Sequence, residues 1–258
     1  MNLQLVKPDL LPSYLEEVKN LQAQFGILKD AEISTDTFSF YTSVSAMASS
    51  KIEGEVLEID SYIKYKMLNI SFAADLVQKP NDLYNAYLFA QTNKLSKTHF
   101  LKAHTQITAN LLASNKRGKY RKVNMLVLEH NTYNVQFEAA NWEEVETLMI
   151  QLWADIEQLK KLPLTIEEVF YYAAYIHLVF VIIHPFEDGN GRSGRLLEKW
   201  FIAERLGERA WYLQSELHYY KNVNDYYKNL NSLGVFYEKL DYTKALPFLL
   251  MLPKSLAL

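Results

Sequence analysis

The chain has 258 residues, 49% of them hydrophobic, with a net charge of -3 and no cysteine. A chain of this length and composition can bury a substantial core, and the absence of cysteine excludes disulfides and thiolate chemistry. The charge gives no basic excess of the kind that would suggest nucleic acid as a default partner, but charge alone says little.

The N-terminus lacks the basic start and apolar run of a secretory signal. The longest apolar stretch, Tyr171 to Ile183, is interrupted by His177 and is shorter than a bilayer requires. We therefore expect a cytoplasmic protein that makes no membrane contact.

Helical periodicity dominates the chain. Apolar residues recur at spacings of three and four, and there are only 8 glycines and 7 prolines. This pattern predicts a mostly α-helical fold. In chain order, we expect one or two helices over 43–65, a helix over 81–92 and another over 99–113.

The next segment breaks the helical pattern. Residues 123–128 and 133–137 are rich in β-branched and aromatic residues, and a polar stretch separates them. The segment predicts a β-hairpin. Because an isolated hairpin is barely stable, we expect it to lie against the helical body.

Two helices with clear boundaries follow. Thr165 and Glu168 have the spacing of a capping box, and Pro185 disfavours helical geometry at the residue before it. The first helix should therefore end at about Ile183 or His184. The second should start within 190–193 and run to about Glu204.

The turn between these helices reads His184-Pro-Phe-Glu-Asp-Gly-Asn-Gly-Arg-Ser-Gly-Arg195. Gly189, Asn190 and Gly191 can present successive backbone N–H groups at a helix N-terminus, which is typical of an anion site. Arg192 and Arg195 share a helix face and can hold a polyphosphate.

Two further side chains add chemistry to this turn. Asp188 is a hard oxygen ligand, suited to Mg²⁺ shared with phosphate oxygens. His184, with an ordinary pKa near 6.5, would be largely neutral at pH 7 and could accept a proton. Each residue alone could simply tie the loop to the core, but their conjunction favours a phosphate-binding site. The turn matches neither a Walker A loop nor a dinucleotide fingerprint.

This turn resembles the signature of the Fic family, His-x-Phe-x-Asp/Glu-Gly-Asn-Gly-Arg-x-x-Arg, at every fixed position. The similarity continues through Gly118-Lys-Tyr-Arg121 and the hairpin to Tyr226-Tyr227. The resemblance implies a Fic-type helical bundle with the hairpin as a flap over the active site. We assign 1–95 to an N-terminal helical region and 96–258 to the catalytic core with C-terminal helices.

The resemblance also implies a reaction, the transfer of AMP from ATP to a Ser, Thr or Tyr hydroxyl of a protein. In that reaction His184 would be the base and Asp188 would hold Mg²⁺ on the α and β phosphates. The backbone from Gly189 to Gly191 would bind the α-phosphate, Arg192 the β-phosphate region and Arg195 the γ-phosphate. The flap would align the target protein by strand pairing. The remaining implied nucleotide-binding residues are Ser193, Gly194, Tyr226 and Tyr227.

A second match lies before the core. The segment from Ser49 to Gly54 is similar to an inhibitory motif, Ser/Thr-x-x-x-Glu-Gly/Asn, found in relatives with an N-terminal inhibitory helix. The resemblance places such a helix at about 43–65, with Ser49 and Glu53 on one face. Glu53 would pair with Arg195 and occupy the space that the γ-phosphate needs.

Several alternatives stay open. The site could transfer another nucleotide or phosphate-bearing group, remove AMP from a modified protein, or bind nucleotide without turnover. Many relatives carry a winged-helix domain after the core, for which the residues after Tyr227 are too few. We expect no nucleic-acid partner, because too few residues remain for this DNA-reading domain. The sequence does not indicate the target protein or the oligomeric state.

Overall fold

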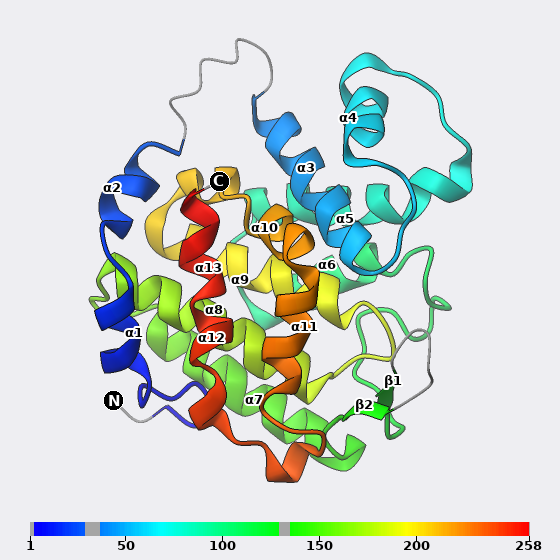
Figure 1. Cartoon of the computed structure of the whole chain (residues 1–258). Helices are drawn as coiled ribbons and strands as arrows, with labels where there is room; N and C mark the ends of the chain where they lie inside the picture. The colour runs from blue at the N-terminus through cyan, green and yellow to red at the C-terminus, as the bar shows by residue number, and fades with distance from the viewer. Residues whose placement is uncertain (1–2, 29–36, 129–134, 258) are drawn as a thin grey trace.

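Two helices, α8 (Ile166–Ile183) and α9 (Asn190–Leu206), form the centre of the fold and pack along each other (Figure 1). The computed structural model describes residues 3–28, 37–128 and 135–257. α8 is apolar around nearly its whole circumference, as expected of a helix enclosed by others. The turn between α8 and α9 carries the signature motif.

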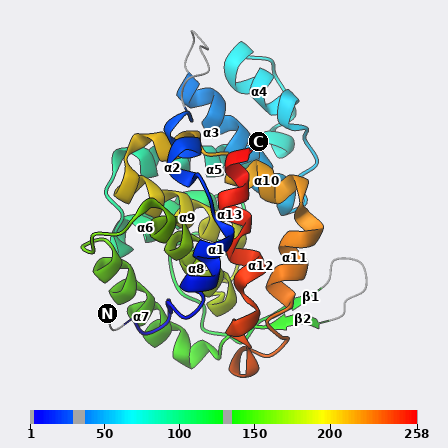
Figure 2. The same cartoon turned by 60° about the vertical axis from the view of Figure 1, so that its left-hand side comes forward.

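The other helices surround this pair, and the prediction of a mostly α-helical fold is confirmed. The short helices near the two chain ends, α1, α12 and α13, lie together over α8 (Figure 2). α6 packs on α9, and α3 packs on α5 and α10. Their bounds are α1 Leu11–Glu17, α2 Leu21–Gly26, α3 Thr37–Ile52, α4 Ile59–Leu68, α5 Ala74–Thr92, α6 Lys97–Ile107, α7 Trp142–Leu159, α10 Ser215–Lys221, α11 Val223–Asn231, α12 Leu246–Leu249 and α13 Met251–Lys254.

The predicted boundaries of α8 and α9 are confirmed. The Thr165 side chain accepts from the Glu168 backbone N–H, and the Glu168 carboxylate accepts from the Thr165 N–H, which completes the capping box. α8 ends at Ile183, and His184 turns into the left-handed region with φ 53°. α9 begins at Asn190, within the predicted window.

The prediction of one or two helices over 43–65 is confirmed, since α3 and α4 lie there and Gly54 with φ 89° lies in the turn between them. The helix that carries Ser49 is α3, which ends at Ile52 and does not extend over the whole range.

Two other predicted ranges need correction. α5 begins seven residues before the predicted 81 because burial of Val77 and Pro80 overrides the proline's weak helix preference. α6 ends at Ile107 rather than near 113, because the Asn110 N–H bonds the Asp82 carboxylate instead of continuing the helix.

The predicted hairpin is present as β1 (Leu126–Leu128) and β2 (Val135–Glu138), which pair antiparallel. Its turn, 129–134, with the first two residues of the predicted second strand, lies outside the described residues. β2 also docks on the body, since the Glu138 N–H donates to the Val235 carbonyl at 2.7 Å. The hairpin therefore does lie against the helical body.

α8 is long and apolar enough to cross a membrane by length and composition, although only the shorter run 171–183 stood out in the sequence. In the fold 83% of it is buried, as in the core helix of a globular protein. α3, from the predicted N-terminal region, packs directly against α10 of the predicted catalytic core. The division at residue 95 stays a prediction.

Candidate active site

The motif turn is held in shape by its own side chains. The Asn190 amide accepts from the Phe186 N–H and donates to the Phe186 carbonyl, at 2.9 and 2.8 Å. Phe186 is fully buried and stacks on the His104 ring with centroids 3.5 Å apart. Asn190 thus contributes to the site by fixing the loop.

Arg121 is a positioning residue to which the sequence analysis gave no role. Its guanidinium donates to the carbonyl oxygens of His184 at 2.7 Å and of Val123 at 2.7 Å, and also to Ala140. The side chain therefore joins the end of α8 to the base of the hairpin. Its place in the segment Gly118-Lys-Tyr-Arg121, which shares the family resemblance, was the signal available in the sequence.

His184 is arranged as a proton acceptor. Its Nδ1 lies 3.2 Å from the Val181 carbonyl, so the neutral ring carries its proton there and leaves Nε2 to accept another. Burial, together with the Arg121 charge, lowers the pKa of His184 to about 4. The imidazole is therefore neutral at pH 7.

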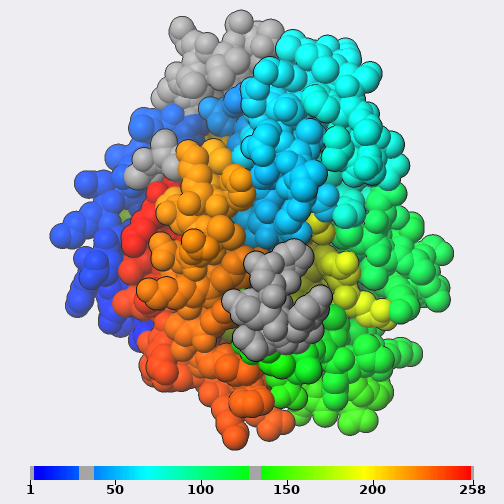
Figure 3. All heavy atoms as spheres, turned by 45° about the vertical axis from the view of Figure 1, so that its right-hand side comes forward, coloured from blue at the N-terminus to red at the C-terminus, as the bar shows by residue number. Residues whose placement is uncertain are grey.

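His184 lines a cavity whose walls come from several parts of the chain. The hairpin contributes Val127 and Phe137, and α11 contributes Tyr226 and Tyr227. The cavity measures about 150 Å³, less than the roughly 300–1,000 Å³ usual for ligand pockets. Glu53 fills part of the space. The segment that carries the turn reaches the molecular surface, as the yellow atoms in Figure 3 show.

His104 holds the backbone of Asp188 in place by a hydrogen bond. Its Nδ1 accepts from the Gly118 N–H at 2.9 Å, so Nε2 carries the proton and donates to the Asp188 carbonyl at 3.0 Å. The ring is fully buried, and burial lowers the pKa of His104 to about 4. The sequence pattern placed no function on this histidine, since its partners come from elsewhere in the fold.

The Asp188 carboxylate fits a magnesium ion whose other ligands come from the phosphate oxygens of a substrate. The Asp188 side chain is exposed, and one carboxylate oxygen accepts from the Gly189 N–H at 2.6 Å. Across residues 3–28, 37–128 and 135–257, no three His, Cys, Asp or Glu side chains are grouped to hold a metal by themselves. Mg²⁺ commonly binds through one or two carboxylates plus phosphate oxygens.

The Glu53 carboxylate lies at the start of α9, where the sequence predicted an anion site. One carboxylate oxygen lies so close to Gly191 that a Cβ there would be 2.3 Å from it. The same oxygen accepts a hydrogen bond from Arg195 Nη2 at 2.6 Å. Gly191 is therefore required for an oxyanion to approach the backbone at this point.

Ser49 completes the hold on Arg195. Its hydroxyl accepts from Arg195 Nε at 2.8 Å, and its carbonyl accepts from Nη2 at 3.1 Å. Arg195 is fully buried, and Glu53 lies one residue beyond the end of α3. The predicted co-location of Ser49 and Glu53 is present, although Glu53 sits in the turn and not in the helix.

The opposite charges of Glu53 and Arg195 each favour the ionised form of the other. Burial by itself would raise the pKa of Glu53, but the charges of Arg195 and Arg192 outweigh it and hold that pKa below its ordinary value. Burial acts to lower the pKa of Arg195, and Glu53 reverses this, so its pKa is raised. Both groups are fully charged at neutral pH.

Arg192 has a carboxylate partner that the sequence analysis missed. Its Nη2 lies 3.1 Å from an oxygen of Glu55, which also accepts from Lys79. Arg192 is 3% exposed. Nothing in the local sequence around either residue indicates this pairing, since they are 137 positions apart.

The two tyrosines of α11 reach the site. The Tyr226 hydroxyl lies 3.1 Å from His177 Nε2 and 3.5 Å from Arg195, and Tyr227 donates to the Ile52 carbonyl at 3.3 Å. Burial raises the pKa of Tyr227 to about 12, so it stays protonated. The role of Tyr226 and Tyr227 in nucleotide binding stays a prediction.

The remaining motif residues face inward. Ser193 is fully buried, and a Cβ on Gly194 would lie 2.7 Å from Val181 of α8. Gly194 therefore permits the close packing of α8 on α9. Whether either residue also binds nucleotide stays a prediction.

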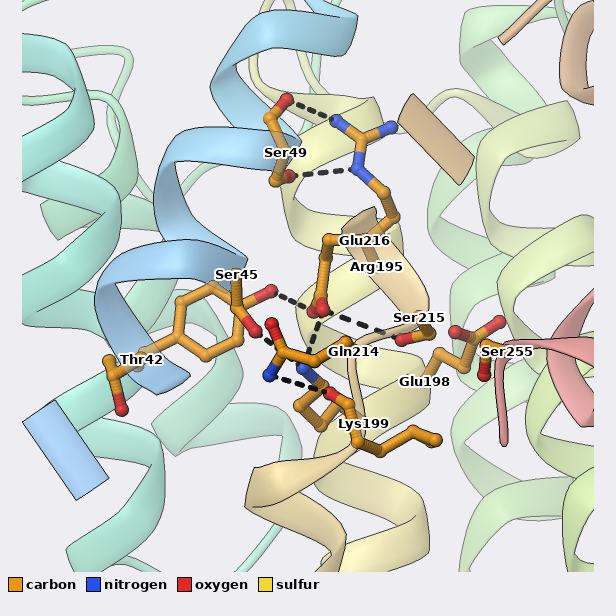
Figure 4. Close-up of polar contacts among 12 residues, drawn as sticks. Thr42, Ser45, Ser49, Arg195, Glu198, Lys199, Gln214, Ser215, Glu216 and Ser255 are labelled. Carbon is orange, nitrogen blue, oxygen red and sulfur yellow. Dashed lines mark hydrogen bonds and ion pairs between the residues drawn. The ribbon is translucent and has the colours of Figure 1, made fainter. Parts of the chain in front are cut away.

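A buried polar cluster lies beside Arg195 and joins α3, α9 and α10 (Figure 4). Lys199, one turn after Arg195, donates to Ser45 of α3 and pairs with Glu216 of α10. Lys199 and Glu216 are both fully buried. Ser45 and Ser49, four residues apart on α3, thus bind two cations four residues apart on α9.

The fold and the turn define a helical domain with an anion site at a helix N-terminus and a neutral histidine beside it. Residues 94–202 match the Fic/DOC family, and the chain therefore carries a Fic domain. A sequence comparison with curated proteins gave no significant match.

Solved structures agree on the fold. The chain is similar to a Fic family protein from Desulfovibrio desulfuricans, with a TM-score of 0.75 and 19% identity, over 100% of this chain and 74% of that one. A Fic domain containing signaling protein from Bacteroides thetaiotaomicron gives 0.68 and 20%, over 95% of both chains. A segment of Fic-1 from C. elegans gives 0.67 and 16%, over 97% and 72%.

Proposed function

We propose that the protein is an adenylyltransferase that moves AMP from ATP to a Ser, Thr or Tyr hydroxyl of a target protein. A Fic domain supports transferase activity of this general kind. The observation that carries the proposal is the grouping of His184, the backbone at Gly191 and the Arg195 guanidinium around one cavity. A base, an oxyanion site and a phosphate-binding cation are the parts that nucleotidyl transfer needs.

In the proposed step, the target hydroxyl oxygen bonds to the α-phosphorus as the bond to the pyrophosphate oxygen breaks. The hydroxyl proton moves to His184 Nε2, and pyrophosphate leaves. Backbone N–H groups at the start of α9 stabilise charge on the α-phosphate oxygens. Arg192 and Arg195 hold the departing phosphates. Mg²⁺ bound at Asp188 would supply further charge neutralisation.

Autoinhibition by Glu53 is part of the proposal. Its carboxylate lies against Gly191 and Arg195, where a polyphosphate would have to bind. An anion cannot enter that space until the carboxylate leaves. If the Glu53-bound arrangement is favoured by about 3 kcal/mol, activity is reduced roughly a hundredfold.

The position of the label on ATP tests the reaction class. Glu53→Gly protein is incubated with cell extract and ATP labelled at either the α or the γ phosphate. AMP transfer labels protein from the α position alone. Labelling from the γ position above that given by the extract alone, where endogenous kinases act, would replace the proposal with phosphoryl transfer. ATP binding without either label would favour a binding module.

Removal of AMP is the second candidate, and one observation favours it. Glu53 and His184 line the same cavity, so the carboxylate could orient a water molecule for attack on a phosphorus. In that case Glu53→Gly would abolish release of AMP from a modified protein. Under the first proposal, Glu53→Gly would increase AMP transfer to the target protein.

A further inference from the structure

Two cations meet at a single carboxylate oxygen beside the motif turn. Glu55 Oε1 lies 3.1 Å from Arg192 Nη2 and 3.0 Å from Lys79 Nζ. The three residues come from α9, α5 and the turn after α3. The geometry is that of an anion cradle made by Arg192 and Lys79, with Glu55 as its occupant.

The cradle differs from an ordinary surface ion pair. Arg192 is 3% exposed, and its Nε has no hydrogen-bond partner in the described part of the chain. A buried guanidinium requires an anion beside it, because leaving the charge unpaired is strongly unfavourable. Glu55 meets that requirement in this structure, and another anion could replace it while using the spare donor.

The position of the cradle indicates which anion. Arg192 follows Gly191, which contacts Glu53, and precedes Arg195, which pairs with it. Glu53 and Glu55, two residues apart, therefore neutralise two arginines that share a face of α9. The two carboxylates thus bind arginines three residues apart on α9, and we expect successive phosphates of one chain to bind the same pair.

We propose that Lys79 and Arg192 form a second phosphate-binding cradle, which takes a distal phosphate of a nucleoside triphosphate when Glu55 leaves. This inference rests on the proposed nucleotide site and adds Lys79 as a binding residue. It also makes Glu55, like Glu53, a carboxylate of the protein that competes with the nucleotide's phosphates for an arginine. Removing Glu53 alone frees Arg195 but leaves Arg192 and Lys79 occupied.

The Glu55 carboxylate can leave the cradle by rotation of its own side chain. The backbone of the turn is held, because the Glu55 N–H donates to the Ser50 carbonyl of α3 at 3.1 Å. The Glu55 side chain is 13% exposed, so it borders solvent into which it can turn.

The test is calorimetric binding of inorganic tripolyphosphate to variants in a Glu53→Gly background. Glu55→Gln should tighten binding about tenfold, because it removes a competing negative charge. Adding Lys79→Gln to that variant should weaken binding again by about tenfold, because a phosphate contact is lost. Lys64→Gln, which removes a charge paired with Asp60 on exposed α4, should change affinity by less than about twofold.

The alternative is that Lys79 only anchors Glu55. Lys79→Gln alone would then tighten binding, and its addition to Glu55→Gln would change nothing. Either result overturns the cradle while leaving the proposed function standing. If no folded variant binds tripolyphosphate, the cradle and the proposed nucleotide site both fail.

ATP and AMP provide a second readout in the same variants. Because Lys79 is assigned to a distal phosphate, Lys79→Gln in the Glu55→Gln background should weaken ATP binding about tenfold and leave AMP binding unchanged. Equal losses for both ligands would show a general structural effect and contradict the assignment. Thermal unfolding of each variant verifies that it is folded.

Discussion

The Glu53 carboxylate is bonded to the Arg195 guanidinium at 2.6 Å and lies directly against Gly191. Arg195 is fully buried and also donates to Ser49, from Nε to the hydroxyl and from Nη2, which Glu53 shares, to the carbonyl. The pair thus joins the end of α3 to the start of α9. Under the proposed function, a phosphate that binds Arg195 displaces Glu53.

Ser49→Ala should weaken the inhibited arrangement. The change removes the acceptor of Arg195 Nε, a hydrogen bond worth about 1 kcal/mol, and activity should rise about fivefold. The matched control is Ser50→Ala, because the neighbouring hydroxyl is also buried but has no hydrogen-bond partner in the described residues. Initial rates of label transfer measure the effect. Equal rates for the two variants would contradict the role of Ser49.

The buried pair Lys199–Glu216 should stabilise the packing of α9 and α10 against α3. Both side chains are fully buried, and Lys199 also donates to Ser45. Glu216→Leu should lower the free energy of unfolding by about 3–5 kcal/mol, because it leaves Lys199 without its carboxylate. The double variant Lys199→Met/Glu216→Leu should recover most of that loss in urea unfolding. A double variant less stable than Glu216→Leu would be inconsistent with this account.

His184 should stay neutral well below its ordinary titration range. Burial lowers the pKa of His184 to about 4, so its ring resonances should not titrate between pH 7 and pH 5. NMR of the ring protons, assigned with His184→Ala, measures this. A titration midpoint near 6.5 in the free protein would show that the ring is not enclosed as described.

The same lowered pKa has a consequence for stability. Because the folded protein resists protonation of His184, the histidine's contribution is present above about pH 6.5 and is lost as pH falls towards about 4. The free energy of unfolding should fall over that range. The fall should be shallower in His184→Ala, and identical slopes would count against the shift.

Arg121 should influence the reaction through the position of His184. Its bonds to the carbonyls of His184 and Val123 fix the catalytic turn against the hairpin base. In a Glu53→Gly background, Arg121→Ala should lower kcat at least tenfold, since small misplacements of a base are costly. The Kd for ATP should change less than about twofold, because Arg121 contacts no proposed phosphate site. Unchanged kcat with weakened ATP binding would contradict this role.

Local signals in the sequence predicted the catalytic turn well. The Thr165 capping box and Pro185 act on adjacent residues, so they fixed both ends of α8 without knowledge of the fold. The same is true of the start of α9 at Asn190.

Residues far apart in the sequence were not predicted to meet. The pairing of Glu55 with Arg192 and Lys79 depends on how α3, α5 and α9 pack, and neither carboxylate spacing nor helix periodicity encodes it. The bonds of Arg121 and His104 to the motif turn arise in the same way. The start of α5 was misplaced because burial of Pro80 outweighs its local preference.

The most direct test of autoinhibited AMP transfer compares three proteins incubated with Mg²⁺ and ATP labelled at the α-phosphate, alone and in cell extract. The account predicts faint protein labelling by wild type, labelling raised roughly a hundredfold in Glu53→Gly, and none in Glu53→Gly/His184→Ala. Glu58→Gly, which removes an exposed carboxylate five residues away, should label as wild type does. Equal labelling by wild type and Glu53→Gly, or labelling that survives loss of His184, would contradict the account.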